Sequence, residues 1–203
     1  MYESSPPQVE YQVTPPVTGL PDEVLANQAQ IGQARISREA FGELYHRHVK
    51  RIYRYHLART GNAAEAEDLT TQTFLAALEG IHTYRKQRPF SAWLYGIASH
   101  KMIDHYRRQR NHISLENAEE YQDSNASIDE IVLTRLNMEQ VSIALRSITA
   151  ERAEALVWRM FAGLCAAEVG QIMDKSETAV RMLVMRGLED LRQRLTVPAE
   201  VEK

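Results

Sequence analysis

The sequence contains little cysteine and no long apolar run. Its single cysteine, Cys165, excludes a disulfide framework and any zinc site built from several cysteines, and it favours a reducing compartment. No apolar segment approaches the roughly 18 residues by which a membrane-spanning helix is recognised. The first residues lack the basic and apolar parts of a secretory signal. We therefore expect a cytoplasmic protein that does not insert into a membrane.

Proline is scarce after the first residues. Five of the seven prolines fall within residues 1–21, and Pro89 is the only one between residues 22 and 197. Long stretches are thus free to form helices. No segment shows the alternation of apolar and polar residues that is typical of strands. With 44% apolar and 25% charged residues the composition is that of a folded protein, and 203 residues suffice for one large domain or two small ones.

Apolar residues recur at three- and four-residue steps in several segments. Helices are predicted over residues 37–59, 63–79, 89–111, 128–148, 150–161, 166–173 and 177–195. Asn62, with Glu65 three residues later, resembles a capping box at the start of the second helix, and Gly80 ends it. The predicted fold class is all-α, with two small helical domains joined by a flexible acidic linker. The domains are predicted over residues 36–113 and 135–196, with the linker over 114–134.

The two ends of the chain are expected to lie outside these domains. Residues 1–35 are acidic, rich in proline and poor in aromatic residues, which predicts a disordered arm. A short helix that starts at Pro21 is an alternative within the arm, because apolar residues follow it at helical spacing. Residues 197–203 are predicted to form a short tail.

The net charge of −3 conceals a strong segregation of charge along the chain. Residues 81–113 carry seven Lys and Arg against one Asp, a net charge of +6. Residues 114–139 carry seven acidic residues against one Arg, a net charge of −6. A basic block beside an acidic one predicts a surface that binds a polyanion, followed by a solvated spacer.

The last two predicted helices are separated by only the turn Asp174-Lys175-Ser176. A short helix, a tight turn and a longer helix form the arrangement called a helix-turn-helix, whose second helix fits the major groove of DNA. With its apolar stripe buried, the second helix would expose six residues near its start: Glu177, Thr178, Arg181, Met182, Met185 and Arg186. The alternative is a helical bundle whose arginines are simply solvated.

Two stretches resemble a known family. The first has the pattern F-x-x-W-L-x-x-I-A…D-x-x-R-R, formed by Phe90, Trp93, Leu94, Ile97, Ala98, Asp104, Arg107 and Arg108. Together with AEAEDLTTQTFLAAL before it, this stretch resembles region two of the extracytoplasmic-function (ECF) sigma factors of bacterial RNA polymerase. The segment 148–195 resembles region four of the same family. The linker is too short to hold the middle domain of primary sigma factors.

The resemblance implies partners and site residues. Asp68, Thr71 and Gln72 would dock on the clamp of core RNA polymerase, and the C-terminal domain would touch the flap. The loop 80–89, with Tyr84, Arg85 and Lys86, would capture an unpaired base of the promoter −10 element. His100, Lys101, Arg107 and Arg108 would lie on the −10 DNA, although the family usually has Asn where His100 stands. The last helix would read the −35 element, and an anti-sigma factor is expected as a further partner.

Two other functions compete with this one. A stand-alone helix-turn-helix transcriptional regulator would bind duplex promoter DNA without the polymerase. The pairs Glu43-x-x-His46 and Glu79-x-x-His82 fit the Glu-x-x-His element of di-iron bundles, but Gly80 interrupts the second pair and further inward glutamates are not evident. The sequence shows no catalytic constellation, so we expect neither an enzyme nor a cofactor or metal.

Overall fold

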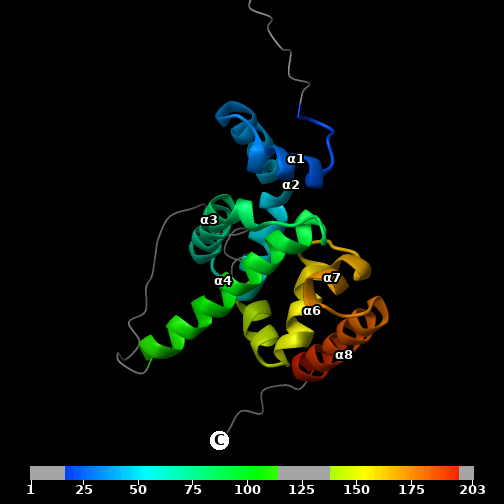
Figure 1. Ribbon diagram of the computed structural model, residues 1–203. Helices are drawn as coiled ribbons and strands as arrows, with labels where there is room; N and C mark the ends of the chain where they lie inside the picture. Colours follow the sequence, from blue (N-terminus) through cyan, green and yellow to red (C-terminus); the bar gives the residue numbers. More distant parts are fainter. Residues whose placement is uncertain (1–16, 114–137, 197–203) are drawn as a thin grey trace, which may run out of the picture.

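The computed structural model describes residues 17–113 and 138–196, and all of its regular elements in those ranges are helices (Figure 1). The helices are α1 (Asp22–Ile31), α2 (Ala34–Thr60), α3 (Ala63–Gly80), the 3-10 helix η1 (Ile81–Thr83), α4 (Phe90–Ile113), α6 (Ala150–Met160), α7 (Ala166–Met173) and α8 (Glu177–Thr196). Residues 138–146 form a further helical segment. The predicted linker 114–134 and the tail 197–203 lie outside the described residues, as do residues 1–16.

The first unit, residues 17–113, is built around the long helix α2. Helices α1 and α3 pack along α2, and α4 crosses them both. Gly61, with φ of 75°, ends α2, and the Asn62 side chain then accepts hydrogen bonds from the backbone N–H groups of Ala64 (2.9 Å) and Glu65 (3.2 Å). The Asn62 half of the predicted capping box is therefore confirmed, but the Asn62 N–H donates to Thr60 Oγ1 at 3.2 Å rather than to Glu65. The cap sets α3 antiparallel to α2 so that their apolar faces meet.

The expected disordered arm is wrong for residues 17–35, because α1 is part of the core of the first unit. Leu25 and Ala26 are fully buried against α2. At the start of α1, the Asp22 carboxylate accepts from Arg47 Nη1 at 2.9 Å and contacts His48 Nε2 at 2.7 Å. A helix of ten residues is marginal in isolation, so these tertiary contacts stabilise it.

The second unit consists of residues 138–196. Helix α6 lies at its centre, with Trp158 fully buried, and it packs against both α7 and α8. Gly187 of α8 lies so close to α6 that an added Cβ would be 2.7 Å from Leu156 Cδ1. Helices α7 and α8 are joined by residues 174–176, the turn that the sequence predicts.

The two units pack directly against each other, whereas the sequence indicated only a tether between them. The rings of Tyr55 and Trp158 stack, with centroids 3.9 Å apart and an interplanar angle of 8°, and Tyr95 stacks on the same indole at 5.0 Å. Helices α6 and α7 accordingly lie beside α2 and α4 (Figure 1). We call this packed arrangement the closed form.

Glu154 is the polar centre of this interface. Its carboxylate accepts from the Tyr55 hydroxyl at 2.9 Å, from Ser99 Oγ at 2.5 Å and from Trp158 Nε1 at 3.0 Å. Burial and the charge of Glu154 together raise the pKa of Tyr55 well above its usual value. The phenol therefore stays protonated and remains a hydrogen-bond donor across the interface.

Candidate nucleic-acid interface

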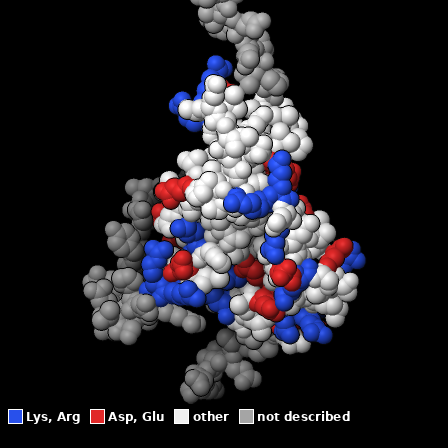
Figure 2. All heavy atoms as spheres, viewed as in Figure 1, with Lys and Arg blue, Asp and Glu red and all other residues white. Residues whose placement is uncertain are grey.

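The outer half of α4 carries a group of exposed positive charges. Figure 2 shows Lys and Arg side chains gathered where α4 leaves the body of the molecule. Arg107, Arg108 and His100 are exposed, and Lys101 is half-buried. Arg107 Nη1 lies 3.7 Å from Asp104 Oδ1 one turn earlier, with 76% of its side chain exposed. The guanidinium is thus oriented by Asp104 but remains available to a phosphate.

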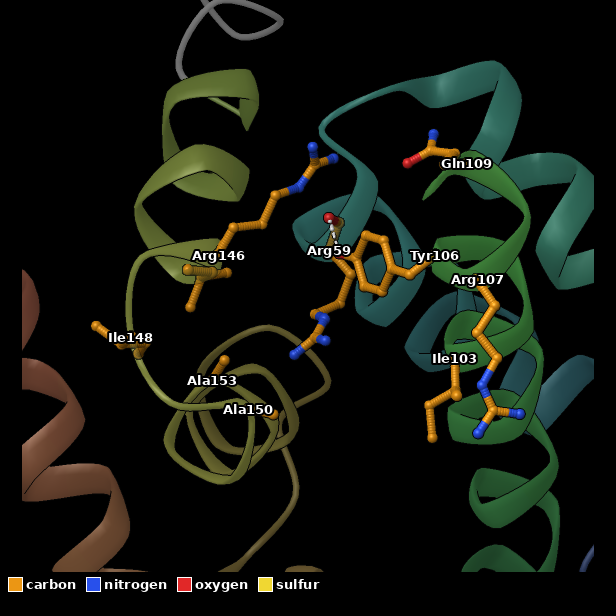
Figure 3. Close-up of a pocket in the computed structure, with 10 residues that line it drawn as sticks. Arg59, Ile103, Tyr106, Arg107, Gln109, Arg146, Ile148, Ala150 and Ala153 are labelled. Carbon is orange, nitrogen blue, oxygen red and sulfur yellow. Dashed lines mark hydrogen bonds between the residues drawn. The ribbon is translucent and has the colours of Figure 1, made fainter. Parts of the chain in front are cut away.

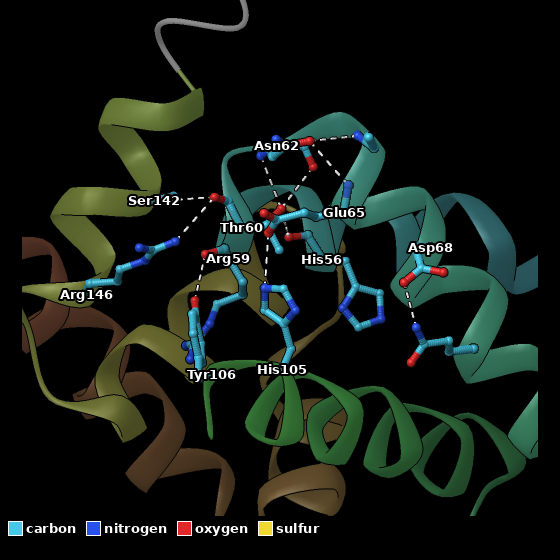
Figure 4. Close-up of polar contacts among 12 residues, drawn as sticks. His56, Arg59, Thr60, Asn62, Glu65, Asp68, His105, Tyr106, Ser142 and Arg146 are labelled. Carbon is cyan, nitrogen blue, oxygen red and sulfur yellow. Dashed lines mark hydrogen bonds and ion pairs between the residues drawn. The ribbon is translucent and has the colours of Figure 1, made fainter. Parts of the chain in front are cut away.

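A polar cluster fixes this part of α4 on the joint between α2 and α3 (Figure 4). The Tyr106 hydroxyl donates to the carbonyl of Arg59 at 2.6 Å, and His105 Nε2 lies 3.0 Å from Glu65 Oε2. His56 Nε2 contacts Thr73 Oγ1 at 3.1 Å. Because Tyr106 and His105 immediately precede Arg107, these contacts determine which way the basic surface of α4 faces.

Tyr84 does not have the exposure predicted for a residue that stacks on an unpaired base. Only 3% of it is exposed, its hydroxyl donates to the carbonyl of Arg88 at 3.0 Å, and its ring packs against Phe90 and Trp93. Burial raises the pKa of its phenol. Gln30 of α1 donates to the carbonyl of Tyr84 at 2.9 Å and so holds the loop from the other side. Tyr84, which was predicted to help capture an unpaired base, instead supports the loop from within the core.

The exposed surface of the same loop is cationic. Arg85, Lys86 and Arg88 are exposed, and Arg85 Nη1 folds back to donate to the carbonyl of His82 at 2.9 Å. Arg88 was not among the predicted site residues, although its charge was counted in the basic block. Its Nη2 lies 3.6 Å from Asp174 Oδ1 in the turn between α7 and α8. The loop of the first unit and the turn of the second thus meet in the closed form.

The start of α8 presents the face that the sequence predicted. All six predicted residues are exposed: Glu177, Thr178, Arg181, Met182, Met185 and Arg186. Val180, fully buried, anchors the opposite face, and Ser176 Oγ accepts from the N–H of Ala179 at 3.2 Å to cap the helix. Arg181 pairs with Glu177 and keeps 71% of its side chain exposed. The first turns of α8 are therefore firmly positioned and open to a ligand.

A third surface lies on the outer face of α3. Gln72 Nε2 donates to Asp68 Oδ2 at 2.6 Å, and the Thr71 hydroxyl donates to the carbonyl of Glu67 at 3.0 Å. Leu75 and Leu78 extend the same face and are 54% and 49% exposed. Figure 4 shows Asp68 directed away from the polar cluster described above. A mixture of polar groups and exposed leucines suits a protein partner better than a nucleic acid.

Neither a metal site nor a membrane helix is found in the described part of the chain. Within residues 17–113 and 138–196, no group of His, Cys, Asp and Glu side chains is placed to hold a metal ion. Glu43, from one of the two Glu-x-x-His pairs, accepts from Arg47 Nε at 2.8 Å. None of the described helices combines the length and the apolar character needed to cross a membrane.

In the described residues, these features define an all-helical protein with two exposed candidate binding surfaces on separate units: a cationic one along α4 and its loop, and one with two arginines at the start of α8. Comparison with known proteins finds similar sequences and structures. Residues 44–112 match the family described as Sigma-70 region 2. ECF RNA polymerase sigma factor BldN of Streptomyces coelicolor is 34% identical over 174 residues, which cover 84% of this chain and 64% of that protein. Over most of its length the chain is thus similar to ECF sigma factors of RNA polymerase.

This chain covers nearly the whole length of two further relatives. RNA polymerase sigma factor YlaC of Bacillus subtilis is 27% identical over 169 residues, 82% of this chain and 98% of that protein. The solved structure of CnrH in complex with the cytosolic domain of CnrY matches with a TM-score of 0.64 and 25% identity, over 86% of this chain and 96% of that chain. CnrH is a sigma factor of Cupriavidus metallidurans. The chain thus spans less than two thirds of BldN but nearly all of YlaC and CnrH.

Proposed function

We propose that this chain binds core RNA polymerase in the cytoplasm and directs it to promoters that it recognises at two separate elements. The observation that carries the proposal is the exposed basic half of α4 in the unit that matches Sigma-70 region 2. The chain contributes recognition rather than catalysis. It joins the nucleoid only as part of the polymerase complex.

The first unit reads the −10 element. Arg107, Arg108, Lys101 and His100 contact phosphates along α4, and displaced counterions make this attraction strong and dependent on salt. The loop 80–89 takes an extruded base. Extrusion costs a few kcal/mol of lost stacking, which contacts with the loop must offset. Since Tyr84 is buried, Arg85, Lys86 and Arg88 are the loop residues assigned to this role.

The second unit reads the −35 element through α8. The major groove of B-DNA admits one helix, and the exposed start of α8 is the part that enters it. Arg181 and Arg186 are the residues assigned to base edges, where each good contact discriminates by about 1–3 kcal/mol. Arg181 exchanges its ion pair with Glu177 for a contact to DNA.

Besides promoter DNA, the chain binds two protein partners, core RNA polymerase and an anti-sigma protein. The α3 face with Asp68, Thr71, Gln72 and the two exposed leucines docks on the polymerase clamp, and the second unit contacts the flap. CnrH was solved in complex with the cytosolic domain of CnrY, and a sigma factor RpoE of Bartonella quintana in complex with the anti-sigma factor NepR. We infer that an anti-sigma protein likewise binds this chain and holds it inactive.

The closed form must open on a promoter. Elements centred near −10 and −35 lie on the order of 25 base pairs apart, or about 85 Å at 3.4 Å per base pair. Two units in direct contact cannot span that length. Core polymerase therefore supplies binding energy that separates Tyr55 from Trp158 and exposes Glu154.

Charge reversal on α4 tests the proposal. The double variant Arg107→Glu/Arg108→Glu is expected to lose open-complex formation at least a hundredfold, because four units of charge change beside the DNA, while binding to core polymerase is retained. Footprinting with permanganate measures the first property and co-purification with core enzyme the second. The control, Arg38→Glu/Lys50→Glu, makes the same change in charge at exposed positions of α2.

Retention of open complexes by the α4 variant would contradict the assignment. Tight, sequence-specific binding of the chain alone to duplex DNA would favour the stand-alone regulator instead. The match of residues 44–112 to Sigma-70 region 2 argues against that alternative.

A further inference from the structure

A cavity of about 590 Å³ lies at the junction of the two units (Figure 3). The end of α2 and the outer half of α4 form one side, and the segment 138–146 with the start of α6 forms the other. Its volume lies within the range of about 300–1,000 Å³ that is typical of small-molecule sites. Of the residues that line it, only Arg107 has a role in binding promoter DNA or polymerase assigned above, on the −10 DNA.

The polar part of the cavity is cationic. Arg59 and Arg146 lie on Tyr106 at 5.4 and 5.5 Å from its ring centroid, and Arg107 also lines the space. The residues that line the cavity include three arginines and no carboxylate. An anion that enters therefore meets guanidinium groups without displacing an acidic side chain from the lining.

Several N–H groups of Arg59 and Arg146 have no close hydrogen-bond acceptor in the protein. Arg59 Nε is buried without a hydrogen-bond partner, and its Nη1 has only a long ion pair, 3.5 Å from Glu154 Oε2. Arg146 Nη2 reaches the carbonyl of Thr60 at 3.4 Å, a long hydrogen bond. Burying a guanidinium with unsatisfied N–H groups costs free energy that a bound anion would recover. With Asp104 near Arg107, the three arginines and the two nearby carboxylates leave a net charge of +1.

The rest of the lining is apolar. Leu145 and Ile148 are nearly buried beneath it, and Ile103, 46% exposed, projects from α4 on the opposite side. Ala150 and Ala153 leave room between them because their side chains are small. A ligand that fits both halves has an anionic group at one end and a hydrocarbon or aromatic portion at the other.

We propose that this cavity binds a small amphipathic carboxylate. The carboxylate lies between Arg59 and Arg146, and the apolar portion lies on Ile103, Leu145 and Ile148. Because both units contribute to the lining, the ligand binds the closed form and shifts the population toward it. Such a ligand lowers the fraction of chain free to join core polymerase, a consequence that rests on the proposed function.

Binding is tested on the full chain with octanoate as the probe. Octanoate is expected to raise the melting temperature saturably, and calorimetry is expected to give a single site. Octan-1-ol, which lacks the charge, and inorganic phosphate, which lacks the tail, are expected to bind at least tenfold more weakly. Equal responses to octanoate and octan-1-ol, or no saturable binding below about 10 mM octanoate, would overturn the proposal.

Two variants locate the site. Arg146→Leu removes one cation at an exposed position, and Ala150→Phe fills the cavity without changing its charge. Both are expected to weaken octanoate binding at least tenfold. The matched control Arg54→Leu removes an exposed cation of α2 that does not line the cavity, and its affinity is expected to stay within twofold of wild type. Unchanged affinity in both cavity variants would place octanoate elsewhere and refute the assignment.

The effect on closure is measured separately from transcription. Dyes at Glu67→Cys and Glu189→Cys, in a Cys165→Ser background, report the distance between α3 and α8. Octanoate is expected to increase the compact population, and Ala150→Phe is expected to abolish that response. A compact population unchanged by saturating octanoate would refute the link to closure. If octanoate compacts the chain but no promoter is used with or without it, the proposed function fails while the binding site stands.

Discussion

At Gly170, helix propensity and close backbone packing favour different residues. A glycine within α7 lowers helix propensity by about 1 kcal/mol relative to alanine. The turn before α8, however, passes so close that an added Cβ would lie 2.5 Å from the carbonyl oxygen of Lys175. The N–H of Lys175 also donates to the carbonyl of Gly170 at 2.9 Å. Close backbone approach therefore outweighs propensity at this position.

Gly170→Ala is accordingly expected to destabilise the chain by about 1–3 kcal/mol, since backbone atoms cannot move aside as a flexible side chain can. Urea denaturation measures the free energy of unfolding. The control is Gly42→Ala in the interior of α2, where an added Cβ meets nothing within 4 Å. That substitution is expected to stabilise by about 0.5–1 kcal/mol. A Gly170→Ala protein as stable as wild type would show that the turn can shift.

His56 gives the stability of the chain a dependence on pH. Burial, together with the nearby charges of His105 and Arg59, lowers the pKa of His56 to about 3. The unfolded chain binds this proton near pH 6.5 and the folded chain does not, so the contribution is fully present above pH 6.5. It is lost as the pH falls from 6.5 toward 3.

Between pH 6 and pH 4, His56 is expected to contribute a slope of up to about 1.4 kcal/mol per pH unit to the free energy of unfolding. His56→Gln, which cannot titrate, is expected to remove that part of the slope and to retain a hydrogen bond toward Thr73. The matched control is His46→Gln, at an exposed position of α2. Identical pH profiles of wild type and His56→Gln, measured by urea denaturation, would contradict the assignment.

At the scale of the helices, periodicity and capping predicted most of what was found. The long apolar stripes and the cap at Asn62 located α2 and α3, and Pro89 located the start of α4. Side-chain exposure was harder, because it depends on what another element covers. Tyr84 looked like a polar loop residue, yet Gln30, Phe90 and Trp93 enclose it. Helix α1 was predicted only as an alternative to a disordered arm, because its stability comes from partners far along the chain.

Helix α1 is held partly by the ion pairs of one carboxylate, that of Asp22. Although burial opposes it, hydrogen bonds from His48 and Arg47 lower the pKa of Asp22. Asp22→Ala is expected to cost about 1.5–3 kcal/mol, typical of hydrogen bonds to a charged group, and to release α1. Hydrogen exchange at Leu25 and Ala26 is the measurement, with Glu23→Ala as the neighbouring control. Protection of α1 that is equal in both variants would mean that apolar packing alone holds it.

At the scale of the molecule, the sequence indicated two units but not their contact. The interface rests on Tyr55, Tyr95 and Trp158, which periodicity alone assigns to the core of whichever unit holds them. Its polar centre, Glu154, has no local signal at all. The Glu154 carboxylate accepts hydrogen bonds from side chains of both units. When the two units separate, water can form hydrogen bonds with these polar atoms instead. We infer that the closed form is stable enough to be populated and polar enough to open when core polymerase binds.

The central claim is that the two units read two elements of one promoter while core polymerase holds them apart. The most direct test transcribes fragmented genomic DNA of the source bacterium with core polymerase alone and with the chain added, and sequences the 5′ ends of the transcripts. New start sites are expected to share two motifs, near −10 and −35, at a constant spacing. Absence of new start sites, or a single shared motif without a partner at fixed distance, would contradict the account.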